Sequence, residues 1–463
     1  MAKLIRVSFV SLGCAKNLVD SEKMLGQLVE AGCAITEDDN DADVTVINTC
    51  GFLEASRTEA DDVIREAVAR KGNGQLKRVV VAGCLVQRDR SAILQRIPGV
   101  DALVGVNNRD DIVRAVLSGA DAKTRRNLKK TLRAPDVFLS DYHPFVQIDT
   151  ARLRLTPRHY AYLRISEGCD QKCTFCTIPA IRGRMHCKPP AVVLEEAREL
   201  VGDGAVEISL IGQDTTSYGL GEDQFGGGLA SLLRSLDRVE GLEWVRLMYV
   251  YPSVMTDEML GAVAGCEHVC KYIDIPLQHI NDRVLKAMHR RITRSQTEQL
   301  LQNIRERIPG VTIRTTLIAG FPSETDAEFD ELVAFIKDFR FDALGVFPYS
   351  LEPETPSGRM TGQLPEKVKV ERVDALMAAQ QDVAFAAGDD RIGTTFAVLV
   401  DERSESGVLS SRHQGQAPMV DGVTYIDGCD AAPGEFVSVR CVGRKTYDLI
   451  AKPTRRSLRV LRA

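Results

Sequence analysis

Short apolar runs alternate with amphipathic stretches along most of this 463-residue chain, and this alternation limits the possible folds more than any other feature. Apolar runs bounded by polar or glycine residues predict buried strands, and the stretches between them predict helices. In the first 120 residues the predicted strands are 4–12, 44–48, 78–82 and 102–106. Short buried strands separated by helices are typical of a parallel α/β sheet.

The alternation resumes after residue 160 with six new predicted strands, at 162–166, 206–211, 244–249, 272–275, 312–318 and 343–347. Six strand–helix units predict a partial (β/α)6 barrel of the TIM type rather than a full eight-fold one. A last helix is expected from about Pro365 to Gly388. Five short strands then follow, at 396–400, 407–411, 423–426, 436–441 and 447–451, split by glycine and aspartate turns. They predict a small OB-like β-barrel.

These changes of pattern divide the chain into an N-terminal α/β domain (1–120), a linker (121–158), a central barrel (159–387) and a terminal β-barrel (388–463). The linker carries six Lys and Arg residues and no acid between Lys123 and Arg133, which we interpret as a solvated connector. No run approaches the roughly 20 apolar residues that cross a bilayer. The first apolar run reads as a strand rather than a signal peptide, so a cytoplasmic protein is expected.

Twelve cysteines in a cytoplasmic protein favour metal binding or catalysis over disulfides. Cys169, Cys173 and Cys176 follow the first strand of the predicted barrel, at the end where barrel enzymes hold their active sites. Three thiolates this close can bind one iron–sulfur cube and leave its fourth iron open to a small molecule. The alternative is a structural zinc site completed by His186 or Cys187, although such sites usually use paired Cys-x-x-Cys motifs.

Cys14, Cys50 and Cys84 form a second set, because each lies one to three residues beyond a predicted strand of the first domain. The carboxyl ends of neighbouring parallel strands lie side by side, where open α/β sheets bind their ligands. Chance burial of three unrelated cysteines would not place them at the same point of three successive units. The pattern therefore predicts a second cluster with one free iron.

The motifs around these cysteines resemble those of the radical S-adenosylmethionine methylthiotransferases, over essentially the whole chain. They are SLGCAKNLVDSE (11–22), NTCGF (48–52), ISEGCDQKCTFCTIPAIRG (165–183), YIDIPLQH (272–279) and APMVDG (417–422). They look most like the branch that modifies small-subunit ribosomal protein twelve, and the terminal barrel resembles a TRAM domain. Ala15 stands where that family usually has proline, which we interpret as tolerated drift.

The resemblance implies two [4Fe-4S] clusters and S-adenosyl-L-methionine as cofactors. Cys169, Cys173 and Cys176 would bind the radical-generating cluster, and Cys14, Cys50 and Cys84 an auxiliary cluster that carries the sulfur. The implied target is the β-carbon of an aspartate, from which no side-chain base can take a proton near neutral pH. A 5′-deoxyadenosyl radical made from the cofactor would remove the hydrogen atom instead.

Other cofactor contacts are predicted from position alone. Phe175, between two cluster ligands, is placed to lie against the adenine, although it could equally pack the loop. Gln213 and Asp214 follow the second barrel strand and could hydrogen-bond the cofactor or cap their own loop. Arg182 could pair with a carboxylate of cofactor or substrate. His279 is a possible ligand or acid, and equally a structural histidine.

Between Gly388 and Ile450 the chain has ten acidic and six basic residues, which does not favour nucleic-acid binding. An acidic surface suits a basic ribosomal protein as partner. The tail arginines Arg455, Arg456, Arg459 and Arg462 could contact RNA or solvent. We also expect a monomer served by a low-potential electron donor such as a flavodoxin. The alternatives are methylthiolation of adenosine in transfer RNA, and a non-catalytic iron–sulfur carrier or zinc-stabilised module.

Overall fold

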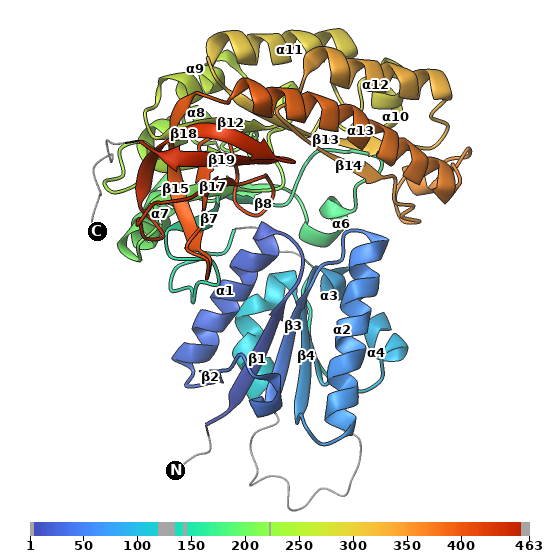
Figure 1. Cartoon of the computed structure of the whole chain (residues 1–463). Coiled ribbons are helices and arrows are strands. Elements are labelled where there is room, and N and C mark those ends of the chain that lie inside the picture. The colour runs from blue at the N-terminus through green and yellow to red at the C-terminus, as the bar shows by residue number, and fades with distance from the viewer. Residues whose placement is uncertain (1–3, 119–134, 142–145, 222–223, 455–463) are drawn as a thin grey trace, which may run out of the picture.

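The structure is a computed structural model that describes residues 4–118, 135–141, 146–221 and 224–454. Three units follow one another along the chain (Figure 1). They are a parallel α/β sheet, a second parallel sheet covered by helices, and a closed barrel. The predicted fold class is therefore confirmed. The basic stretch between Lys123 and Arg133 and the four tail arginines lie outside the described residues.

The first sheet has six parallel strands in the order β2-β1-β3-β4-β5-β6. The strands are β1 (Arg6–Ser11), β2 (Ala34–Ile35), β3 (Val44–Thr49), β4 (Arg78–Gly83), β5 (Ala102–Gly105) and β6 (Asp136–Phe138). The predicted strands correspond to β1, β3, β4 and β5, whereas β2 and β6 were not expected. β6 lies within the segment that the sequence assigned to the linker, yet it pairs with β5.

Helices cover both faces of this sheet because its strands are apolar on both sides (Figure 1). α1 (Ala15–Glu30) and α5 (Ile112–Leu117) pack on one face, against side chains that include Val46 and Val104. α2 (Glu54–Gly72), α3 (Cys84–Asp89) and α4 (Ala92–Arg96) pack on the other, against Ile47 and Val81.

The second sheet has six parallel strands in chain order and is open between its first and last strands. They are β7 (Tyr160–Arg164), β10 (Glu207–Ile211), β11 (Trp244–Leu247), β12 (Val269–Asp274), β13 (Thr312–Ala319) and β14 (Ala343–Pro348). The outer helices are α7 (Pro190–Gly202), α8 (Gly228–Leu236), α9 (Asp257–Gly265), α10 (Asp282–Ala287), α11 (Arg294–Arg307), α12 (Asp326–Phe339) and α13 (Glu366–Asp390). This is the partial barrel that the sequence predicted.

Alternate residues of each barrel strand face opposite sides, as the pleat requires. Leu163, Leu210 and Leu247 point outward into the core formed with the helices. Tyr162 and Tyr272 belong to separate clusters on the inner side, and Tyr162 packs there with Val19 of α1. The N-terminal domain therefore contributes directly to the barrel interior.

The terminal barrel closes in the order β15-β16-β17-β19-β18. Its strands are β15 (Thr395–Arg403), β16 (Leu409–His413), β17 (Thr424–Ile426), β18 (Phe436–Lys445) and β19 (Asp448–Pro453). It is joined to the central sheet by a buried charge network in which Glu207 accepts from Arg246 at 2.8 Å and from Arg412 at 2.6 Å.

Within the described ranges, no helix is long and apolar enough to span a membrane.

Candidate active site

Cys14, Cys50 and Cys84 lie together beyond the carboxyl ends of three strands of the N-terminal sheet, as predicted. Cys14 directly precedes α1, Cys50 follows β3, and Cys84 is the first residue of α3. The strand order reverses between β1 and β3, so Cys14 and Cys50 flank the switch point at which sheets of this kind bind ligands. Cys14 is exposed, Cys50 half-buried and Cys84 buried.

Glycines allow these three cysteine loops to approach one another. A Cβ atom at Gly51 would lie 2.7 Å from the carbonyl oxygen of Cys84, and one at Gly13 would lie 2.9 Å from the Cβ of Cys50. The Asn17 side chain joins the loops by donating to the carbonyl oxygens of Leu12 at 3.0 Å and Thr49 at 2.8 Å. The edge is therefore held by backbone packing as well as by its side chains.

Cys169, Cys173 and Cys176 occupy the loop after β7 and the short strand β8 (Ser166–Glu167), which pairs with β9 (His186–Cys187). All three are half-buried. The sulfur of Cys176 accepts from the Ile178 amide at 3.5 Å, and that of Cys173 from Arg290 at 3.7 Å. N–H groups directed at sulfur stabilise thiolate ligands.

Burial dominates the proton affinity of the most enclosed thiols. It raises the pKa of Cys169 and Cys176 to about 12, and the pKa of Cys84 to about 12 against the opposing charge of Arg182. Without metal these groups are protonated thiols near neutral pH, and binding iron would release their protons. Free thiols at these positions are compatible with binding a metal cluster. They also mean that these cysteines form no disulfide.

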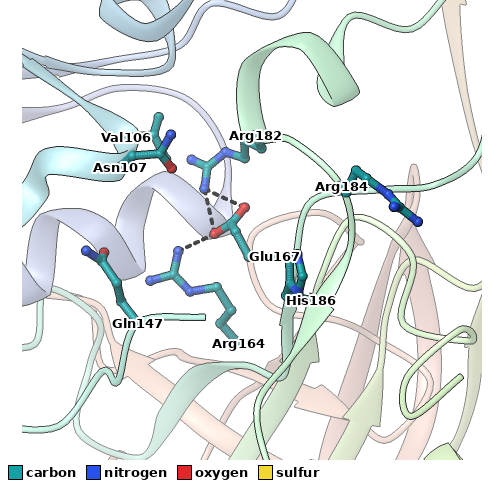
Figure 2. A pocket seen from close by; sticks show the side chains of 8 residues that line it. All are labelled: Val106, Asn107, Gln147, Arg164, Glu167, Arg182, Arg184 and His186. Atoms are coloured by element: carbon teal, nitrogen blue, oxygen red, sulfur yellow. Dashed lines mark hydrogen bonds and ion pairs between the residues drawn. The ribbon is translucent and has the colours of Figure 1, made fainter. Parts of the chain in front are cut away.

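Arg182, at the end of α6 (Ile178–Arg182), joins the two cysteine sites. Its Nη2 atom lies 3.2 Å from the sulfur of Cys84 and 3.0 Å from Asp20, and its Nη1 atom lies 2.9 Å from Glu167. Figure 2 shows Glu167 between the guanidinium groups of Arg182 and Arg164, at a small pocket between the domains. Burial opposes a charge on Asp20, but Arg164, Arg182 and Arg109 hold the pKa of that carboxyl below its usual range.

Each of the two groups offers three free thiols, the ligand type of iron–sulfur clusters. In the part of the chain that the structure describes, no three His, Cys, Asp or Glu side chains converge tightly enough to hold one ion. Zinc gathers its ligands around one centre, whereas each cysteine of a cluster binds a different iron. The structure therefore gives no support to a zinc site completed by His186 or Cys187.

The tentative cofactor contacts differ in how the structure places them. Phe175 packs beside Val284, Met288, Phe321 and Tyr349, which agrees with a loop-packing role. Asp214 is buried and accepts from Gln171 at 3.0 Å and from the Ser217 hydroxyl at 2.7 Å, which is loop capping.

Gln213 points between the two sites, donating to Glu167 at 2.7 Å. His279 is fully buried, accepts at Nδ1 from the Asn281 amide and lies 3.4 Å from Glu324, as a structural histidine would. None of these contacts tests the predicted binding of a cofactor.

Sequence reasoning missed the polar face of α1. Its first turns carry Lys16, Asn17, Asp20, Ser21 and Glu22, all buried. Their helical spacing is visible in the sequence, but a polar helix face normally indicates solvent. Here it is buried against the central domain, where Asp20 pairs with Arg164 and Arg182.

Three family matches cover successive parts of the chain. Residues 6–105 match the Uncharacterized protein family UPF0004, residues 163–336 the Radical SAM superfamily, and residues 392–453 the TRAM domain. The fold is also similar to that of the radical S-adenosylmethionine methyltransferase TsrM from Kitasatospora setae. That similarity has a TM-score of 0.53 at 18% identity and covers 77% of each chain. The central domain is thus that of a radical S-adenosylmethionine enzyme.

Curated relatives then define the family more closely. The chain is 42% identical to the ribosomal protein uS12 methylthiotransferase RimO of Anaeromyxobacter sp. (strain K), over 96% of this chain and 93% of that one. It is 38% identical to the RimO of Desulfitobacterium hafniense (strain Y51), over 96% and 98%. The chain belongs to the RimO family of S-adenosylmethionine-dependent methylthiotransferases, which confirms the resemblance seen in the sequence.

Proposed function

We propose that this chain replaces a hydrogen on the β-carbon of an aspartate in ribosomal protein uS12 by a methylthio group. The observation that carries the proposal is that Arg182, which follows the loop of Cys169, Cys173 and Cys176, contacts the sulfur of Cys84 and also pairs with Glu167. Relatives named for activity on uS12 align with 96% of the chain and support this substrate. Between Gly388 and Ile450 the ten acidic residues outnumber the six basic ones, which also suits a basic protein partner.

The proposed ligands are Cys169, Cys173 and Cys176 for one [4Fe-4S] cluster and Cys14, Cys50 and Cys84 for the other. When bound, these groups and S-adenosylmethionine supply the radical that removes the hydrogen and the sulfur that replaces it. Because the loop offers three cysteines, the fourth iron of a cluster there would be left for S-adenosylmethionine.

The chain's own task is to hold its two cysteine sites at a fixed separation and keep water out. The buried ion pairs of Asp20 with Arg164 and Arg182 hold the domains together at this point. Gln213 and Asp214 are proposed to contact S-adenosylmethionine, since they follow β10 at the same barrel edge. Phe175 is proposed to lie near the adenine from within the cysteine loop.

We further propose that the enzyme works as a cytoplasmic monomer. Reductive cleavage of S-adenosylmethionine needs a low-potential one-electron donor, and a flavodoxin is one such donor. The donor would be identified by measuring cleavage of S-adenosylmethionine in the absence of substrate, with each candidate donor in place of a chemical reductant. A sedimentation experiment on the reconstituted enzyme would determine the oligomeric state.

An anaerobic assay tests the substrate. Reconstituted enzyme, S-adenosylmethionine and a strong reductant are mixed with a peptide carrying the uS12 aspartate loop, and in parallel with unmodified transfer RNA. Mass spectrometry should find a methylthio group in place of one hydrogen on the peptide alone. Cys14→Ala should abolish that product yet retain cleavage of S-adenosylmethionine, whereas Cys169→Ala should abolish both. Modification of the transfer RNA alone would contradict the proposed substrate.

A further inference from the structure

Lys16 is a buried cation for which the structure provides no counter-ion. It lies in the first turn of α1, two residues after Cys14, and its side chain is 7% exposed. Among the described residues, its ammonium forms no hydrogen bond or ion pair. Its Nζ atom instead lies 2.9 Å from the centre of the Tyr249 ring, which follows β11 at the barrel edge.

The two carboxylates whose charges act on Lys16, Asp274 and Glu167, already have partners. Asp274 accepts from Arg314 at 2.8 Å and from the Tyr249 amide at 3.0 Å. Glu167 accepts from Arg164 at 2.6 Å, and Arg182 and Gln213 occupy its remaining lone pairs. A buried ammonium without a counter-ion is costly, and contact with an aromatic face offsets only part of that cost. The described residues near Lys16 therefore offer it no unpaired carboxylate.

We propose that Lys16 binds the carboxylate of the substrate aspartate, an inference that rests on the proposed function. In aspartate the β-carbon is bonded directly to the carboxyl carbon, about 1.5 Å away. A substrate whose β-carbon would meet sulfur carried by a cluster at Cys14, Cys50 and Cys84 would bring its carboxylate to the same site. Lys16 presents its ammonium from the turn that begins at Cys14. One helix terminus therefore positions both the ammonium and a proposed cluster ligand.

This contact also gives the enzyme a means of selection. An aspartate supplies the missing charge, whereas an asparagine or an adenine base leaves the ammonium unpaired in a buried site. A site built around a buried polar group rejects analogues that cannot pair with it. The competing explanation is that Lys16 balances the negative charge of a cluster at Cys14. That role predicts altered iron content, and it predicts no dependence on the substrate side chain.

The test measures binding and iron on the same reconstituted enzyme. A fluorescein-labelled uS12 loop peptide with Asp at the target position, and its Asn counterpart, are titrated by fluorescence anisotropy. Wild type should bind the Asp peptide about 10- to 100-fold more tightly than the Asn peptide. Lys16→Met should lose that discrimination and keep its iron, at about eight per chain. Lys16→Arg should keep part of the preference for the Asp peptide.

Lys23→Met is the matched control, because Lys23 lies on the same helix and already has a partner, the Thr150 carbonyl, to which it donates. It should keep the wild-type preference. If Lys16→Met binds both peptides as wild type does, or loses about half of its iron, the assignment of Lys16 is overturned while the proposed function stands. If wild type neither binds nor modifies the Asp peptide, the proposed function is overturned and this inference with it.

Discussion

The Nη2 atom of Arg182 lies 3.2 Å from the sulfur of Cys84, although the two residues belong to different domains and are 98 positions apart. The same nitrogen donates to Asn17 at 2.8 Å, and Asn17 accepts from Cys84 at 3.4 Å. One guanidinium thus connects the segment that follows Cys176 to Cys84, the most buried of the three N-terminal cysteines.

Replacing Arg182 by Met should destabilise the domain interface. It leaves the buried Asp20 and the half-buried Glu167 with fewer cationic partners, a loss of about 3 kcal/mol for a broken buried pair. Thermal unfolding of the iron-free protein should therefore begin at a lower temperature. Arg184→Met is the control, because Arg184 is exposed and its ion pair with Asp170 is 3.4 Å long. Equal unfolding midpoints for the two variants would contradict the role given to Arg182.

Gly51→Ala should separate the auxiliary cysteines. The added methyl group would meet the Cys84 backbone at 2.7 Å, and backbone cannot move aside as a flexible side chain can. We expect the iron of reconstituted protein to fall from about eight toward about four per chain, with the other cluster retained. Gly72→Ala, at a helix position with open space, should keep its full iron content. Full iron in Gly51→Ala would show that the loops can separate without losing the cluster.

The sequence predicted most of the fold because its strands carry unbroken apolar runs. All six central strands and the five of the terminal barrel lie where the pattern placed them. The convergence of Cys14, Cys50 and Cys84 followed from the rule that parallel strands end at one edge. β2 and β6 were missed because two- and three-residue strands carry too few side chains for a periodic signal.

The domain interface could not be predicted, because local periodicity does not report what a distant segment covers. Lys16 and Asp20 are charged, yet both are buried. Val29 and Leu28 are neighbouring apolar residues, yet Val29 is 46% exposed and Leu28 is fully buried. Both differences arise at α1, where the partner surface is the barrel interior more than 140 residues away along the chain.

Glu207→Gln should weaken the attachment of the terminal barrel. Glu207 is fully buried and is the shared anion of Arg246 and Arg412, so its loss removes the carboxylate from Arg246 and leaves Arg412 with Asp401. The expected cost is about 3–5 kcal/mol. Limited proteolysis should release the terminal barrel from this variant sooner than from wild type. Glu240→Gln, at an exposed position, should be cleaved as wild type is.

The ion pair of Glu328 with Arg283 should make stability depend on acid pH. Arg283 donates to Glu328 at 2.6 Å and lowers the pKa of that carboxyl to about 2. A lowered folded-state pKa gives stability above about pH 4.3 that is lost as the pH falls toward 2. Glu328→Gln should cost about 1 kcal/mol at pH 7, because solvent screens this partly exposed pair, and less as the pH approaches 2. Thermal melts at several pH values, with the exposed Asp338→Asn as control, would measure the difference; a constant gap would contradict it.

Alkylation rates in the iron-free protein should differ among the cysteines according to their burial. Cys14 is exposed and should react first with iodoacetamide at pH 7. Cys84, Cys169 and Cys176 should react slowly, because burial raises each pKa to about 12 and only the thiolate is nucleophilic. Mass spectrometry of tryptic peptides after a short pulse of iodoacetamide gives the order in which the cysteines react. The same labelling of denatured protein gives their unprotected rates. Reconstitution with iron should then protect Cys14 despite its exposure. Rapid labelling of Cys14 in the iron-loaded protein would instead mean that it is not a cluster ligand.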